Sequence, residues 1–266
     1  MNSSDFAKQI REMSVKMVYR ANASHIGGAM SMADILAVLY TDVMKYNPQV
    51  PNWTGRDRFL LSKGHACVSY YATLALAGFF PTEELDSYGQ NGSKFLCHIS
   101  HLVPGVEISA GSLGHGLPYG VGIALAGQIR EQDYHTFVLL GDGEMDEGSN
   151  WEALMFASHH HLNRLCAIID YNKIQSLGNT NEVMNLEPLA DKLKAFNCHV
   201  LNIDGHNHEE ILNAFRKFEI QTDKPTAIIA NTVKGKGVSY MENNLAWHYK
   251  SPDEEQYETA IKEIEK

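Results

Sequence analysis

Residues 135–174 read HTFVLLGDGEMDEGSNWEALMFASHHHLNRLCAIIDYNKI, and this stretch decides the fold. It opens with an apolar run of β-branched and aromatic residues, 136–140, which predicts a buried strand. After a glycine turn, Ser149 and Glu152 form the sequence pattern of a capping box, which predicts the start of a helix. A second apolar run, 165–169, predicts another buried strand. This order of strand, turn, helix and strand is typical of two neighbouring parallel strands joined by a crossover.

Polar residues follow both of these predicted strands. Gly141, Asp142 and Gly143 end the first strand, and Asn172 follows the second. Because the carboxyl ends of adjacent parallel strands meet at one edge of a sheet, we expect Asp142 and Asn172 to lie side by side. A carboxylate, a carboxamide and a nearby backbone carbonyl are oxygen ligands suited to Mg²⁺, which takes its other ligands from phosphates and water, and the helix start adds a positive dipole end. The pair therefore predicts a metal-bridged diphosphate, although Gly-Asp-Gly alone is often only a conformational feature of an α/β turn.

The remaining periodic segments predict an α/β fold in which a parallel sheet is flanked by helices. Predicted strands lie at 56–61, 199–203 and 226–231, and predicted helices lie at 4–19, 117–126, 189–196 and 209–218, with another that ends at Leu76. A further helix is expected to begin at Ser31, with Asp34 closing its cap. We expect residues 1–266 to form a single domain, because no repeat or linker divides them.

Composition narrows the class of protein. The formal net charge of −10 argues against a surface for nucleic acid or for anionic membranes, because no basic face could neutralise phosphates. The first residues form a charged amphipathic pattern and not an apolar signal, and no apolar run reaches membrane-spanning length, which predicts a cytoplasmic protein. The four cysteines are widely spaced and contain no C-x-x-C pair, so we interpret them as structural thiols.

Several further segments, taken in order, carry a resemblance to a known family. They are ANASHIGGAMSMADILAVLY (21–40), RDRFLLSKGHA (56–66), PGVEISAGSLGHGLPYGVGIALA (104–126), GDGEMDEGSNWEA (141–153), DYNKIQ (170–175), HNHEEI (206–211) and WHYKSP (247–252). Gly-Asp-Gly-Glu followed one crossover later by Asn-Lys resembles the thiamine diphosphate motif, and the whole set resembles transketolase. The chain is similar to the amino-terminal, diphosphate-binding subunit of a split transketolase, and the pyrimidine-binding domain would lie on another chain. The resemblance implies the thiamine diphosphate-binding fold.

The resemblance also implies a cofactor site for thiamine diphosphate and Mg²⁺. The metal ligands would be Asp142, Asn172 and the backbone carbonyl of Ile174. His65 would contact the phosphates beside the glycine turn of Gly141 and Gly143. The remaining implied cofactor residues are Gly111 and Leu113, whose backbone would hold the aminopyrimidine ring, and Glu147, a buried acid that would join a network between subunits.

Three histidines match positions that face the substrate in the family: His25, His98 and His248. His98 fits the spacing better than His101, which is the alternative in the same loop. Two neighbours depart from the family pattern. Ile26 stands where proline is common, which predicts a less rigid loop, and Tyr249 stands where glycine is usual, which puts the local backbone and the donor preference in doubt.

Other charged residues near these segments have simpler interpretations. Lys63 precedes a predicted helix and is discounted as a surface lysine. The run His159, His160 and His161 is interpreted as structural, because three consecutive helical residues point in different directions and cannot bind one ion.

The implied reaction is the transfer of a two-carbon ketol unit from a ketose or ketose phosphate to an aldose. In the family the glutamate that protonates the aminopyrimidine belongs to the other domain, and nothing here matches it. We therefore expect activity only with a carboxy-terminal, pyrimidine-domain subunit, as a heterotetramer of two such pairs. The alternatives are a component of another thiamine diphosphate enzyme, such as a 2-oxo acid decarboxylase, dehydrogenase or deoxyxylulose phosphate synthase, and a cofactor-binding scaffold without turnover.

Overall fold

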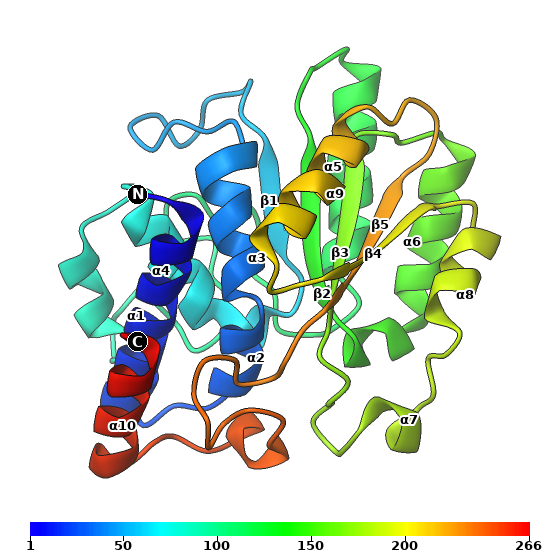
Figure 1. The fold of residues 1–266 in the computed structure, drawn as a ribbon. Coiled ribbons are helices and arrows are strands. Elements are labelled where there is room, and N and C mark those ends of the chain that lie inside the picture. Colours follow the sequence, from blue (N-terminus) through cyan, green and yellow to red (C-terminus); the bar gives the residue numbers. More distant parts are fainter.

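A computed structural model describes all residues, 1–266, and contains one five-stranded sheet (Figure 1). The strands are β1 (Arg58–Leu61), β2 (Thr136–Gly141), β3 (Leu165–Tyr171), β4 (His199–Asp204) and β5 (Thr226–Asn231). Their order across the sheet is β1-β2-β3-β5-β4, and every neighbouring pair is parallel. The predicted α/β fold with a parallel sheet is confirmed.

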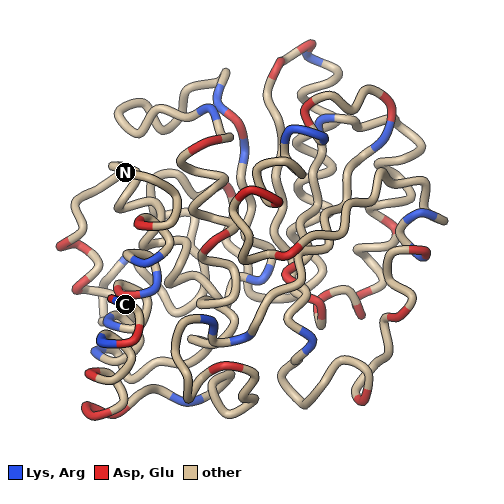
Figure 2. Tube along the Cα trace, viewed as in Figure 1, with Lys and Arg blue, Asp and Glu red and all other residues tan.

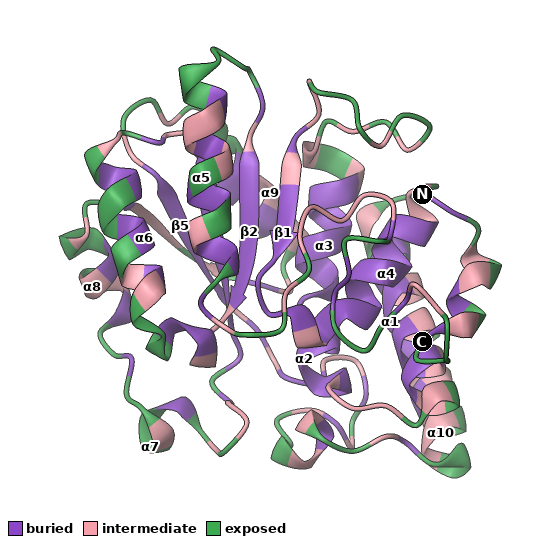
Figure 3. Ribbon diagram, turned by 180° about the vertical axis from the view of Figure 1, so that it is seen from behind, coloured by how far each residue is buried: buried purple, intermediate pink, exposed green.

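Helices cover both faces of the sheet. One face carries α1 (Ser3–Ala21), α2 (Ile26–Ser31), α3 (Ala33–Val38), α4 (Cys67–Leu76) and α9 (His208–Glu219), with α10 (Glu254–Ile264) packed beside α1. The opposite face carries α5 (Gly116–Ile129), α6 (Gly148–His159) and α8 (Leu189–Ala195), while the short α7 (Thr180–Val183) lies in the loop after β3. The sheet is therefore the middle of three layers (Figure 3).

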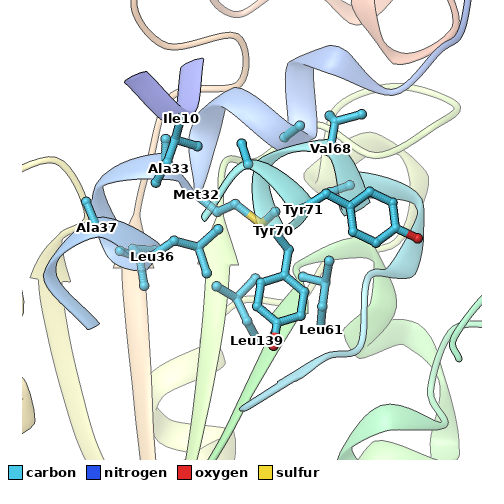
Figure 4. Close-up of a cluster of buried hydrophobic side chains, with 14 of the residues drawn as sticks. Ile10, Met32, Ala33, Leu36, Ala37, Leu61, Val68, Tyr70, Tyr71 and Leu139 are labelled. Atoms are coloured by element: carbon cyan, nitrogen blue, oxygen red, sulfur yellow. The ribbon is translucent and has the colours of Figure 1, made fainter. Parts of the chain in front are cut away.

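Alternation of side chains along the strands creates two separate cores. In β2, Phe137 and Leu139 join the core beneath α1 to α4 and α9, whereas Val138 and Leu140 join the core beneath α5, α6 and α8. Figure 4 shows the first of these cores, in which Leu139 and the neighbouring Leu61 lie close to Tyr70 of α4. Strands buried on both faces need apolar residues at every position, which is why β2 and β3 read as continuous apolar runs.

Both predicted capping boxes are wrong. α6 begins at Gly148, and the Ser149 hydroxyl donates to the carbonyl of Gly114 at 2.6 Å. Ser31 is the last residue of α2, and its hydroxyl donates to Asp170 at 2.6 Å, while Asp34 binds residues of other elements. Long-range polar partners therefore use the side chains that the local pattern assigned to caps.

The surface agrees with the mixed charge of the sequence. Lys and Arg residues are interspersed with Asp and Glu residues along the trace, without a continuous basic stretch (Figure 2). None of the helices combines the length and the apolar character that a membrane crossing requires.

Candidate active site

A cavity opens at the carboxyl edge of the sheet, where β2 and β3 end. Most of the residues that the sequence analysis singled out line it: His25, His65, His98, Gly111, Leu113, Gly141, Asp142, Gly143, Asn172, Ile174 and His248. Two residues from that set lie elsewhere. Glu147 is exposed and outside the cavity, and His101 is exposed with its Nδ1 2.7 Å from the Ser109 hydroxyl.

Three oxygen-bearing groups lie at the inner end of this cavity. β2 and β3 pair in register up to Gly141 and Asp170, so Asp142 and Asn172 follow adjacent strand ends. Asp142 is 3% exposed, and its carboxylate accepts hydrogen bonds from the amides of Gly143 at 2.7 Å and Lys173 at 2.5 Å. The Asn172 side chain is turned so that its Nδ2 donates to Asp170 at 3.2 Å, which directs its Oδ1 away from that acid.

This donor set fits a hard divalent cation. Burial, and then the charge of Asp170, raise the pKa of Asp142 to about 6, so a bound cation would stabilise the ionised carboxylate. A carboxylate, an amide oxygen and the carbonyl of Ile174 are the ligand types that Mg²⁺ takes alongside phosphate oxygens. Nowhere does the chain bring together three His, Cys, Asp or Glu side chains for a metal, so an ion here would depend on amide and carbonyl oxygens.

Lys63 is a buried part of the cavity, so its interpretation as a surface lysine is wrong. It is 2% exposed, and its Nζ donates to Asp170 at 2.5 Å and to the carbonyl of Gly28 at 2.8 Å. Burial alone would raise the pKa of Asp170, but the charge of Lys63 and hydrogen bonds from Lys63, Ser31 and Thr232 keep it below its usual value. The pair is consequently ionic and rigidly held at the base of the cavity.

Lys234 is a second buried cation, which the sequence analysis missed. It is 2% exposed, and its Nζ lies 2.8 Å from the carbonyl oxygen of Ile174 and 2.9 Å from Nδ1 of His248. Burial, followed by the charge of Lys63, lowers its pKa to about 8. Two cations at the inner end favour an anionic ligand, and the basic glycine stretch around Lys234 was the only available signal in the sequence.

Four histidines form the middle of the cavity. The ring of His25 lies 5.1 Å from those of His65 and His248 and 5.8 Å from that of His98, measured between centroids. Burial is the main cause that lowers the pKa of His25 to about 4, that of His248 to about 3 and that of His65 well below its usual value. These three imidazoles are therefore neutral near pH 7 and can donate or accept a hydrogen bond.

Glu144 is the buried acid of the Gly-Asp-Gly turn. It is 1% exposed and accepts hydrogen bonds from the Ser62 hydroxyl, from the amide of Gly114 at 2.9 Å and from the amide of Gly141 at 3.2 Å. Burial raises its pKa. The sequence analysis gave this burial to Glu147, three residues later, which is exposed in this chain. Glu144 therefore ties the glycine loop before α5 to the ends of β1 and β2.

That glycine loop approaches β1 more closely than any side chain would allow. A Cβ at Gly116 would lie 2.3 Å from the Ser62 Oγ, and Gly114 adopts a φ of +79° that favours glycine. The loop thus places Gly111 and Leu113 on the cavity wall with their backbone groups close to its interior.

Comparison with known proteins identifies the family that this arrangement is similar to. Residues 2–263 match the family model described as the transketolase thiamine diphosphate binding domain. The chain is 45% identical to the first of the subunits of an apulose-4-phosphate transketolase from Phocaeicola vulgatus, over 96% of this chain and 90% of the relative. It is 42% identical to the 6-deoxy-6-sulfo-D-fructose transketolase subunit SqwG from a Clostridium species, over 98% of this chain and 95% of the relative.

Solved structures give the same result for the fold. The transketolase from Leishmania mexicana superposes with a TM-score of 0.94 at 32% identity, and that from Campylobacter jejuni with 0.94 at 34%. The match covers 100% of this chain in both cases but only 42% and 43% of those proteins, so this chain spans about two fifths of their length.

Proposed function

We propose a function from the premise that this chain belongs to the transketolase family, whose thiamine diphosphate-binding domain it matches from residue 2 to residue 263. It is one subunit of a transketolase-type transferase, in the manner of its relatives that are named as transketolase subunits. We assign it to the transfer of a two-carbon ketol unit from a ketose or ketose phosphate to an aldose. The observation that carries this assignment is a single cavity in which buried oxygen ligands and two buried lysines adjoin four histidines.

The inner end of the cavity would hold the cofactor. Mg²⁺ would bind Asp142, Asn172 and the carbonyl of Ile174, and the diphosphate would meet the positive charges of Lys63 and Lys234. His65, which is neutral and next to Lys63, would donate a hydrogen bond to a phosphate oxygen. When bound, thiamine diphosphate supplies the electron sink for cleavage of the C–C bond.

The outer histidines would handle the substrate. His25 and His248 are neutral and lie next to each other, so they can take a proton from one hydroxyl and return it to another. His98 is exposed on the cavity wall and would contact the same substrate from the opposite loop. These roles remain proposals that rest on the placement of the three rings around one space.

A pyrimidine-domain subunit would complete the site. Exposed large apolar side chains lie on α5 and α6, where Tyr119 is 57% exposed, Ile129 73% and Met155 60%. Apolar surface of this kind is typical of a face that a partner covers. The proposed enzyme is a heterotetramer of two such pairs, in which the carboxy-terminal subunit supplies the glutamate that acts on the aminopyrimidine.

The decisive experiment is reconstitution. This chain is assayed alone and with a purified pyrimidine-domain subunit, in the presence of Mg²⁺ and thiamine diphosphate, for ketol transfer from a ketose phosphate to an aldose. We expect transfer only with both chains. Turnover by this chain alone would contradict the proposal, turnover of pyruvate in place of the ketose would favour another thiamine diphosphate enzyme, and cofactor binding without any turnover would favour a scaffold.

A further inference from the structure

A buried polar cluster lies behind the cavity and takes no part in the proposed chemistry. At its centre the carboxylate of Asp34 in α3 accepts two hydrogen bonds from Arg11 of α1, at 2.6 and 3.1 Å. The same carboxylate contacts His206 Nδ1 at 2.7 Å and His208 Nε2 at 3.1 Å, both from the turn that begins α9. The side chains of Asp34 and His206 are 8% and 13% exposed, so these contacts are shielded from water.

The hydrogen bonds of His206 define its tautomer. The backbone N–H of Val233 can only donate, and it points at Nε2 of His206 at 2.8 Å. Nε2 must therefore be an unprotonated acceptor, so the proton of the neutral ring is on Nδ1 and is donated to Asp34. His206 is thus a two-sided connector between a fixed carboxylate and the backbone that follows β5.

That backbone carries groups that line the base of the cavity. The Thr232 hydroxyl donates to Asp170, the partner of Lys63, and Lys234 contacts the carbonyl of Ile174 at 2.8 Å. The amide of Gly235 donates to the carbonyl of Gly27 at 2.9 Å. Val233 is the one residue of this segment whose amide is held by a side chain from outside the cavity.

We infer that His206 is a positioning residue, which fixes the 232–235 segment and thereby holds Lys234 in place for the diphosphate end of the cavity. The inference rests on the proposed function for the role that Lys234 serves. The tether itself does not depend on that function. His208 supplies a matched control, because it contacts the same Asp34 but its other nitrogen faces the Ser3 hydroxyl at 2.8 Å, away from the cavity.

Two substitutions separate the two hydrogen bonds of His206. In His206→Asn the amide nitrogen reaches the position of Nδ1 and keeps the bond to Asp34, but no acceptor remains for the Val233 amide. In His206→Gln the side-chain oxygen reaches the position of Nε2 and retains that acceptor. His208→Asn removes one contact of Asp34 without touching the segment.

The first measurement is hydrogen exchange of the Val233 amide in the full chain without cofactor. We expect His206→Asn to speed exchange by about ten-fold, because one buried hydrogen bond is lost, and His206→Gln and His208→Asn to leave it near the wild-type rate. Unchanged exchange in His206→Asn, or equal acceleration in His208→Asn, would overturn the tether.

The second measurement is the thiamine diphosphate concentration that gives half-maximal activity in the reconstituted two-subunit enzyme. We expect it to rise about ten-fold in His206→Asn, with turnover at saturating cofactor retained, and to return in His206→Gln. A loss of turnover at unchanged half-saturation would refute the positioning role. If the wild-type enzyme does not respond to thiamine diphosphate at all, the proposed function fails, while the exchange experiment still decides the tether.

Discussion

At the inner end of the cavity the polar groups follow strand ends and are buried, whereas at the outer end they lie on loops and are exposed. Asp142, Asn172 and Lys63 are 3%, 6% and 2% exposed, and each is held by hydrogen bonds within the chain. His98 is exposed, and Tyr249 is 60% exposed beside His248. The inner end is therefore complete in this chain, and the outer end has a wall on one side only.

This contrast separates two tasks. A rigid, buried end suits the binding of a cofactor that every substrate shares, because preorganised groups need no rearrangement. An exposed end built from loops can vary in shape and in partner without disturbing the sheet. Substitutions at the inner end should change cofactor binding, and those at the outer end should change the choice of sugar.

The largest effect is expected at Asp142. Asp142→Asn keeps the shape of the side chain but removes the charge that a divalent cation needs, so Mg²⁺-dependent thiamine diphosphate binding should weaken by roughly 100-fold. Calorimetric titration of the reconstituted enzyme measures it. The control is Asp146→Asn, an exposed acid in the same turn. Equal affinity in wild type and Asp142→Asn would remove the metal assignment.

The next effect is expected at Glu144, which supports the inner end without facing solvent. Glu144→Gln would turn an amide NH₂ towards at least one of the three donors that converge on this carboxylate, so the free energy of unfolding should fall by about 3 kcal/mol. Urea denaturation of the chain measures this loss. Glu147→Gln, at an exposed position of the same turn, should change stability by less than about 0.5 kcal/mol. Similar stabilities for the two variants would show that Glu144 does not tie the glycine loop down.

A smaller effect is expected at the outer end. Tyr249→Gly should change KM for the donor sugar by a few-fold, on the order of 1 kcal/mol, while the half-saturating concentration of thiamine diphosphate stays the same. Tyr249→Phe distinguishes the ring from the hydroxyl. A change in cofactor affinity without a change in donor KM would contradict the division between the two ends.

The smallest effect is a pH dependence of stability. The pKa values of His25 and His248 are lowered to about 4 and about 3, chiefly by burial, so the unfolded chain binds more protons than the folded chain below pH ~6.5. Their contribution is fully present above that pH and is lost as the pH falls towards 4. Denaturation midpoints of the cofactor-free chain should fall over this range, less steeply in His25→Asn. An identical slope in wild type and variant would show that His25 is not buried in its neutral form.

The sheet and the oxygen groups could be predicted from sequence because their signals are local. The observed bounds of β5 equal the predicted ones, and Asp142 and Asn172 line one cavity because their strands are neighbours. An apolar run that ends in a polar residue describes both the strand and the group placed at its end. The family resemblance added the histidines, which local patterns alone do not distinguish from ordinary loop residues.

The buried cations could not be predicted in this way. Lys63 is buried because Asp170, 107 residues away in sequence, accepts its hydrogen bond, and Lys234 because Ile174, 60 residues away, offers a carbonyl. The choice between Glu144 and Glu147 depends on the register of one tight helical turn, which places the first inward and the second outward. Pairings over such separations follow from topology, which a sequence pattern does not contain.

His25 has a backbone φ of +71°, immediately before the first residue of α2. Apart from glycine, only a few residue types, chiefly asparagine and aspartate, adopt this left-handed conformation readily, so the position has few chemically useful substitutes. Evolution towards a new sugar is therefore restricted at the centre of the histidine group by the main chain itself. The adaptable positions should instead lie around the rim, where Tyr249 has ordinary backbone angles and ample room.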